Sequence, residues 1–96
     1  MASVIVTPTA QRNLATLIRT HSLPDSTLAR FRQSLQPLRD FPLIGARLPR
    51  PGPELRFVLG PWRWMVIVYR YYDESAQVRI ISIHDARSAT SPTSRP

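Results

Sequence analysis

The chain has 96 residues, room for one domain with a single core, and its 43% apolar composition can fill that core without covalent staples. It contains no cysteine, which excludes a disulfide scaffold, a thiolate zinc site, a cysteine nucleophile and a redox switch. Thirteen basic residues, all of them arginine, stand against six acidic ones, so the net charge of +7 predicts an anionic partner: a nucleic acid, an acidic peptide or an acidic protein surface.

The chain begins with a pattern typical of a short strand followed by a helix. Residues 4 to 6 are all β-branched, which favours an extended backbone. Thr7 is a good N-cap, and Pro8 fits the first helical position because no intrahelical bond needs its missing N–H. Apolar residues then recur at helical spacing, which predicts a first helix over residues 8 to 20.

A second helix is predicted to start at Asp25 or Ser26, either of which can cap it, and to end at Pro37. Its expected buried stripe consists of Leu28, Phe31 and Leu35. The two helices should form a hairpin. Residues 37 to 53 hold too many prolines and glycines for regular structure but carry apolar anchors, so they predict a packed loop.

The remainder of the chain predicts an antiparallel sheet. The expected strands cover residues 54 to 59, 62 to 71 and 78 to 84, with a hairpin loop at 72 to 76. The middle one of these strands is apolar on both faces and should be central. The order β-α-α-β-β-β predicts an α+β domain over residues 1–87, with a helical hairpin on one face of a small, mainly antiparallel sheet. We expect residues 88–96 to be a disordered tail.

Alternation along the predicted strands assigns side chains to the two faces of the sheet. Arg56 should project from the face that the helices leave open, opposite to Leu55 and Phe57. Strict alternation also sends Ile80, Ser82 and His84 one way, and Arg79, Ile81, Ile83 and Asp85 the other. Arg56, Arg87 and Arg63 could line one basic concavity, if the pairing register brings them together.

His84 is the candidate for proton transfer, as a general acid, a general base or a donor to phosphate. The favoured alternative is a strand-end histidine that bonds the backbone and holds the next turn. His21, at a helix C-terminus, is assigned no function. The helix arginines form a solvated polar face or a docking surface for an acidic partner; they are Arg12, Arg19, Arg30 and Arg32.

Several kinds of site find no support in the sequence. It has no glycine-rich phosphate loop, no histidine pair with zinc spacing and no carboxylate cluster for magnesium, so we expect no metal and no other cofactor. Its longest apolar run is far shorter than the roughly 20 residues that span a bilayer, and its N-terminus does not have the pattern of a signal peptide. We therefore expect a cytoplasmic protein that does not enter a membrane.

Four short motifs, in order, resemble those of the RelE/ParE superfamily, the toxins of bacterial type II toxin-antitoxin modules. Residues 38 to 45 are similar to the family's L-x-x-x-P-x-x-G segment, and Leu55-Arg56 follows in the next strand. Residues 66 to 70 are similar to V-x-Y-R, and residues 80 to 87 to I-L-x-V-x-H-x-x-R. The resemblance covers about residues 3 to 87. It implies a toxin that inhibits growth, stabilises plasmids and forms a hetero-oligomer with a cognate antitoxin.

The superfamily divides by mechanism, and the resemblance leaves two targets open. RelE-like members cut messenger RNA on the ribosome with lysine, arginine and a C-terminal tyrosine, whereas this chain has no lysine and no tyrosine after Arg87. The H-x-x-R ending is more similar to the ParE branch, whose members bind DNA gyrase, and this reading is favoured. A non-toxic nucleic-acid-binding relative is the third option.

The resemblance and the charge pattern together name candidate site residues. The target-binding set is Arg56, Arg79, His84 and Arg87. The antitoxin-binding set is the four helix arginines, Arg12, Arg19, Arg30 and Arg32. If the chain is a ribonuclease, the residues expected to act are Arg56, Arg63, His84 and Arg87; otherwise the chain is not an enzyme.

Overall fold

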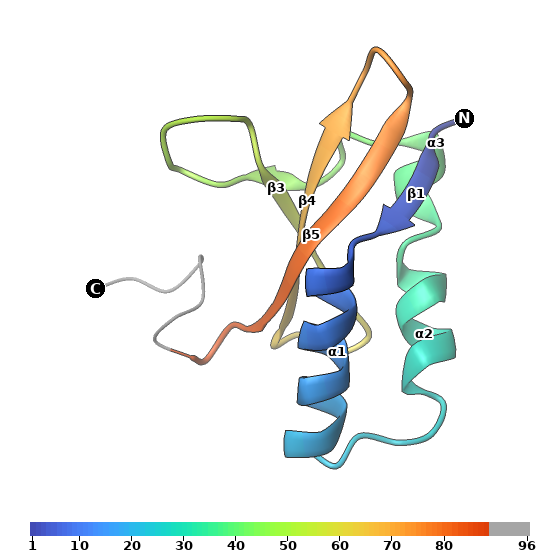
Figure 1. Cartoon of the computed structure of the whole chain (residues 1–96), viewed down its shortest axis with the longest axis vertical. Coiled ribbons are helices and arrows are strands. Elements are labelled where there is room, and N and C mark those ends of the chain that lie inside the picture. Colours follow the sequence, from blue (N-terminus) through green and yellow to red (C-terminus); the bar gives the residue numbers. More distant parts are fainter. Residues whose placement is uncertain (89–96) are drawn as a thin grey trace.

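The computed structural model describes residues 1–88; the tail predicted to be disordered lies, apart from Ser88, outside this part. The helices and strands follow one another in the predicted order, with two short additions (Figure 1). In chain order the elements are β1 (Ser3–Val6), α1 (Pro8–Thr20), α2 (Thr27–Ser34), α3 (Pro37–Asp40), β2 (Ala46–Arg47), β3 (Arg56–Leu59), β4 (Met65–Tyr72) and β5 (Gln77–Asp85). The α+β architecture is confirmed.

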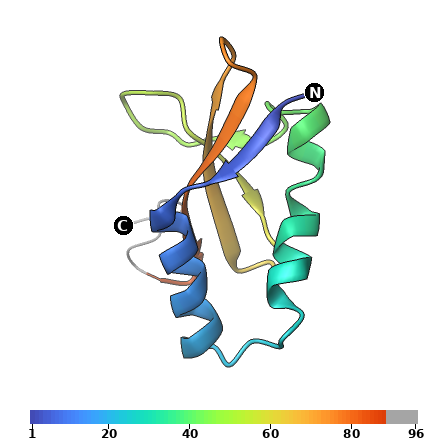
Figure 2. The ribbon, with the colours of Figure 1, turned by 45° about the vertical axis from the view of Figure 1, so that its right-hand side comes forward.

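The five strands form one sheet in the order β1-β5-β4-β3-β2. β1 pairs with β5 in parallel, and the other neighbours are antiparallel. β4 is central as predicted, and its residues 65 to 69 are all buried. Helices α1 and α2 lie on the same face of the sheet (Figure 2). None of the helices within residues 1–88 has the length and apolar character needed to cross a membrane.

Helix α1 begins at the predicted residue because Thr7 both caps it and ties it to the sheet. The Ala10 N–H donates to the Thr7 hydroxyl oxygen, and that hydroxyl donates to the carbonyl of Ile80 on β5 at 2.7 Å. Further along α1, the side-chain oxygen of Asn13 accepts the backbone N–H of Ile83. β1 pairs only with the first part of β5. Beyond this part, the Asn13 side chain of α1 accepts a hydrogen bond from a backbone group on the open edge of β5.

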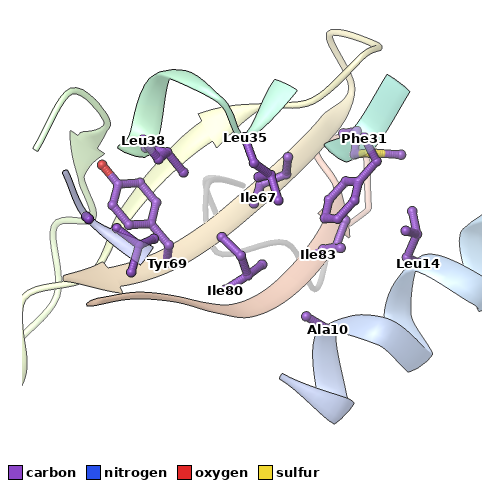
Figure 3. Packing of buried hydrophobic residues seen from close by; sticks show 12 residues of the cluster. Ala10, Leu14, Phe31, Leu35, Leu38, Ile67, Tyr69, Ile80 and Ile83 are labelled. Carbon is purple, nitrogen blue, oxygen red and sulfur yellow. The ribbon is translucent and has the colours of Figure 1, made fainter. Parts of the chain in front are cut away.

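The main core lies between the two helices and the sheet. Phe31 from α2, Leu35 directly after it and Leu14 from α1 point toward the apolar side chains of β4 and β5 (Figure 3). The prediction that Leu28 belongs to the buried stripe is wrong, because it is 46% exposed. The buried positions along α2 recur every four residues, beginning with Thr27, which donates to the Pro24 carbonyl. Leu28 is the next residue after Thr27, so its side chain points away from this buried face.

The segment predicted as a loop contains α3 and the two-residue strand β2, so that prediction is wrong for these short stretches. α2 ends at Ser34, and Pro37 then occupies the first helical position of α3 rather than merely stopping α2. Between α3 and β2, the buried hydroxyl of Tyr69 accepts the N–H of Gly45 at 2.9 Å. A side chain on Gly45 would meet the Phe57 carbonyl at 2.6 Å, so glycine is needed for this close approach.

Candidate functional site

The face of the sheet opposite the helices carries a row of polar side chains on β5. The strand bulges between the residues facing Val68 and Tyr69, so that Ser82 pairs with Val68 and Ile80 pairs with Tyr69 while Ile81 is passed over. Strict alternation was therefore the wrong prediction for this strand. Ile80 and Ile83 both enter the main core, whereas Ser82 and His84 oppose Val68 and Val66, which belong to a second apolar cluster.

This second cluster defines what we call the open face. Its buried members are Leu48, Val66 and Val68, with Leu55, Phe57, Ile81 and Ala86 packed against them. Arg79 lies on the same face, because it directly opposes Arg70 and stands immediately between the core residues Val78 and Ile80, whose side chains point to the other face. Two members of the predicted target-binding set, Arg79 and His84, thus share the open face, and Ser82 lies between them.

His84 is held on the open face by a side chain rather than by the backbone. Its Nε2 lies 2.8 Å from the Ser82 hydroxyl oxygen. Burial lowers the pKa of His84 below its ordinary value, which favours the neutral imidazole around neutral pH. The expected bond to a main-chain group is replaced by this serine contact, and the ring retains hydrogen-bonding capacity for a ligand.

Arg56 lies on the helix side of the sheet, so its predicted face is wrong. It pairs with Tyr69, a main-core residue, while its neighbours Leu55 and Phe57 pack in the open-face cluster. The Nη1 group of Arg56 donates to the carbonyls of Leu43 and Gly45 at 3.1 and 2.8 Å, and its Nε donates to Glu54. These bonds, together with Tyr69, fasten the loop before β2 and use donors that a ligand would need.

Arg87 belongs to a cluster at the far end of β5, which we call the β5-end cluster: His21, Trp64, Asp85 and Arg87. The Arg87 guanidinium makes two bonds to the Asp85 carboxylate, at 3.0 and 2.9 Å, and lies over the Trp64 ring. The His21 ring stacks on Trp64, and its Nε2 lies 2.8 Å from Asp85 Oδ2. The Arg87 bonds, followed by other contacts that include His21, hold the pKa of Asp85 well below its usual range.

The predicted concavity of Arg56, Arg63 and Arg87 is not assembled by the register. Arg56 pairs at Tyr69 and Asp85 pairs at Met65, a separation of about 13 Å along β4. Arg63 is exposed in the turn before β4. Sequence reasoning assigned no role to His21, yet this residue connects the end of α1 to the β5-end cluster. Since 64 residues separate it from Asp85, no local pattern could have shown that contact.

The helix arginines predicted to bind an antitoxin are all exposed. A hollow of about 380 Å³ lies between α1 and α2, lined mainly by apolar side chains that include Leu14, Ile18 and the exposed Leu28, with Arg32 at its margin. Arg30 instead extends over the Trp62 ring, at 5.9 Å from its centroid. The helical hairpin therefore carries an apolar hollow with cationic groups around it.

Within the described part of the chain, no three histidine, aspartate or glutamate side chains gather in a way that could hold a metal ion. The residues described above offer charge recognition by guanidinium groups and proton exchange at imidazole.

Comparison of the whole fold with solved structures identifies close architectural relatives. The isolated RelE toxin of Escherichia coli aligns over 94% of this chain and 89% of its own, with 18% identity and a TM-score of 0.65. The RelBE2 toxin-antitoxin complex of Mycobacterium tuberculosis contains a chain with 27% identity, aligned over 88% of this chain and 96% of that one, with a TM-score of 0.62.

An archaeal RelE-RelB complex from Pyrococcus horikoshii is also similar, with 15% identity, coverage of 92% of this chain and 98% of that chain, and a TM-score of 0.61. No protein-family model matches the sequence, and no curated protein is similar to it. The resemblance to the RelE/ParE superfamily that the four motifs indicated is confirmed by this common fold; these structures do not distinguish the ParE-like branch.

Proposed function

We propose that this chain, a member of the RelE/ParE superfamily by its fold, is the toxin of a type II toxin-antitoxin module, acts in the cytoplasm on DNA gyrase and is neutralised by a cognate antitoxin. The observation that carries the proposal is the open face, on which Arg79, Ser82 and His84 form one row on a fold shared with RelE toxins. A row of this kind can recognise an anionic macromolecular surface without a metal or a cofactor.

Binding rather than cleavage is favoured by the chemistry of the row. A guanidinium stays protonated at every physiological pH and cannot exchange protons with a substrate. His84 is the residue of the row whose ordinary pKa lies near neutrality, and its Nε2 is already bonded to Ser82. Cleavage of a phosphodiester needs one group to accept a proton and another to give one. A gyrase-binding surface needs neither.

The hollow between α1 and α2 supports the antitoxin part of the proposal. An amphipathic acidic helix could place apolar side chains against Leu28 and Ile18 and its carboxylates near Arg32. Arg12 and Arg19 are exposed on α1, where they would speed the encounter with an acidic segment. The similar structures from Mycobacterium tuberculosis and Pyrococcus horikoshii are toxin-antitoxin complexes, which is consistent with such a partner here.

Ribosome-dependent cleavage of messenger RNA is the second candidate, and one observation favours it. The similar structures named above are RelE proteins, and the resemblance associates RelE-like members with that activity. In this case His84 would be the proton-exchanging residue, and Arg87, two residues beyond the end of the same strand, would stabilise the charge that develops on the phosphate.

The decisive experiment expresses the chain from a tightly controlled promoter and follows growth, gyrase supercoiling and messenger integrity together. Arrested growth with inhibited supercoiling by the purified chain, and with uncut messages, is the expected result. Codon-linked cuts in primer extension, with supercoiling undisturbed, would replace gyrase by the ribosome as the target. Harmless expression in the absence of any antitoxin would contradict the toxin assignment itself.

A matched pair of variants sharpens this experiment. His84→Gln and Arg79→Gln each change one residue of the open-face row, whereas Arg39→Gln removes one exposed charge outside it. If gyrase binding is electrostatic, Arg79→Gln should weaken inhibition and His84→Gln should have the smaller effect. If the chain cleaves RNA, the order reverses, because only His84 can exchange a proton on this row.

A further inference from the structure

Three side chains near the β4–β5 hairpin form a compact cationic group on the open face. Arg70 and Arg79 are direct cross-strand partners. Both guanidinium groups lie over the ring of Tyr72, at 4.6 and 4.7 Å from its centroid. The Nε of Arg79 also donates to Gln77 Oε1 at 2.6 Å, which fixes the direction of that side chain. We call Arg70, Tyr72 and Arg79 the arginine-tyrosine patch.

The direct opposition of the two arginine charges is itself unfavourable for folding. Like charges directly opposite one another on a sheet repel. A carboxylate at either position would replace this repulsion by an attraction. The ion pairs found within residues 1–88 use Glu54 and Asp85, and neither carboxylate pairs with Arg70 or Arg79. Among residues 1–88 the patch therefore keeps two permanent positive charges side by side with no carboxylate paired to either, so it is open to an anion from another molecule.

We propose that the arginine-tyrosine patch binds the phosphodiester backbone of a nucleic acid. Stacking on Tyr72 orients both guanidinium planes while their outer N–H groups stay available, and such planar forks match the oxygens of a phosphate. A nucleic acid presents one negative charge per nucleotide, so neighbouring phosphates can engage both arginines at once.

Recognition at this patch should ignore base sequence. Both arginines already lie over the Tyr72 ring, so its π-face is occupied and is not offered to a base. The anion should also approach from one side. Asp73 and Glu74 of the hairpin turn line a hollow with Arg70 and would repel a polyanion there, whereas Ser82 and His84 continue the open face beyond Arg79. The phosphate chain should therefore run from Arg79 toward His84.

The inference deepens the proposed function, on which it depends for its biological meaning, because gyrase and the ribosome both hold nucleic acid. The probes are a fluorescein-labelled single-stranded RNA, a labelled duplex DNA and a labelled poly-glutamate peptide, each titrated with the full chain in fluorescence anisotropy over a range of salt concentrations. The test variant is Arg70→Gln/Arg79→Gln. Its charge-matched control is Arg39→Gln/Arg50→Gln, at two exposed arginines outside the patch.

The test variant should bind nucleic acid about tenfold more weakly. The slope of log K against log salt concentration should become shallower by about 0.7 per lost phosphate contact on RNA, or by about 0.9 on duplex DNA. The control variant should stay close to the parent chain. The arm with the larger loss identifies whether the phosphates belong to RNA or DNA. Arg70→Lys/Arg79→Lys keeps the charge but not the planar forks, so it should recover only part of the affinity. Thermal unfolding verifies that each variant is folded.

Equal weakening by the test and control variants would overturn the site, because net charge alone would then explain binding. So would a parent chain that binds neither nucleic acid, or one whose patch affects only the poly-glutamate peptide, which would assign the patch to protein carboxylates. The two proposals can fail separately. Patch-dependent binding in a chain that is harmless in cells overturns the toxin function alone, while gyrase inhibition with patch-independent binding overturns the patch alone.

Discussion

The two faces of the sheet differ in how their polar side chains are paired, although the same strands form both. On the helix-covered face, Tyr69 is fully buried and its hydroxyl accepts a bond from Gly45, and Arg56 beside it is bonded to two carbonyls and a carboxylate. Within residues 1–88, every buried polar side-chain atom has a partner. The open face instead places Arg70 against Arg79. The main core and its bonded polar groups lie on one face, and the residues proposed for recognition lie on the other.

Removing the Tyr69 side chain should be the most damaging change to the covered face. Tyr69→Ala deletes a fully buried ring from the main core and should cost about 3–5 kcal/mol of unfolding free energy. Tyr69→Phe keeps the ring but leaves the buried Gly45 N–H without its acceptor, and should cost about 1–3 kcal/mol. Urea unfolding measures both. Equal losses would show that the hydroxyl, not the packing, dominates.

A substitution in the β5-end cluster measures how much the contacts at the end of β5 contribute to stability. Asp85→Asn preserves the shape of the side chain but removes the charge shared by Arg87 and His21, and should cost about 1–3 kcal/mol near neutral pH. Asp73→Asn, on the exposed hairpin turn, is the control and should change little.

The sign of the pH dependence follows from the depressed pKa of Asp85. The folded state keeps this carboxylate charged at a pH where the unfolded chain, with an aspartate pKa of about 3.9, already takes up a proton. The contribution of Asp85 is therefore complete above about pH 5 and is lost as the pH falls further, through the folded-state pKa. A difference between parent and Asp85→Asn that stayed constant from pH 7 to pH 3 would contradict this account.

How far the sequence predicts this molecule depends on how local the information is. Thr7 and Pro8 mark the start of α1 correctly, since a cap and a first-turn proline act within a few residues. The sequence also predicts the central position of β4 correctly, because a strand that is apolar on both faces must be covered on both. In residues 38 to 45, the motif glycine has a direct cause, the contact of Gly45 with Tyr69.

The site was harder to predict because it depends on register. Counting outward from the hairpin turn gives Arg70 opposite Arg79, so that signal was available in the sequence. The bulge at Ile81 has no comparable mark, and it moves Ser82 and His84 onto the open face with Arg79. The face of Arg56 was misjudged because Leu55 and Phe57 pack in the second cluster, which alternation alone cannot distinguish from the first.

His84 gives a smaller effect that separates the faces by pH. Because burial lowers its pKa in the folded state, the unfolded chain takes up a proton first as the pH falls through about 6.5. The unfolding free energy of the parent should therefore drop between pH 7.5 and pH 5.5 by more than that of His84→Gln. Parallel pH profiles would place His84 in an ordinary solvated environment.

The smallest expected effect is that of Arg79→Gln on the unfolding free energy. It distinguishes the two faces most directly, because substitutions on the covered face should lower this free energy and Arg79→Gln should raise it. Arg79→Gln removes one of two opposed like charges, so it should raise the unfolding free energy by about 0.2–1 kcal/mol at low salt. Salt screens exposed charges, so the gain should shrink toward zero near 1 M salt, where the Debye length is about 3 Å. The Arg56 side chain is only 18% exposed and donates to Glu54 and to two backbone carbonyls, so Arg56→Gln should destabilise the protein at both salt concentrations. A loss of stability in Arg79→Gln would mean that stacking on Tyr72 outweighs the repulsion, and the pair would then be structural rather than held for an anion.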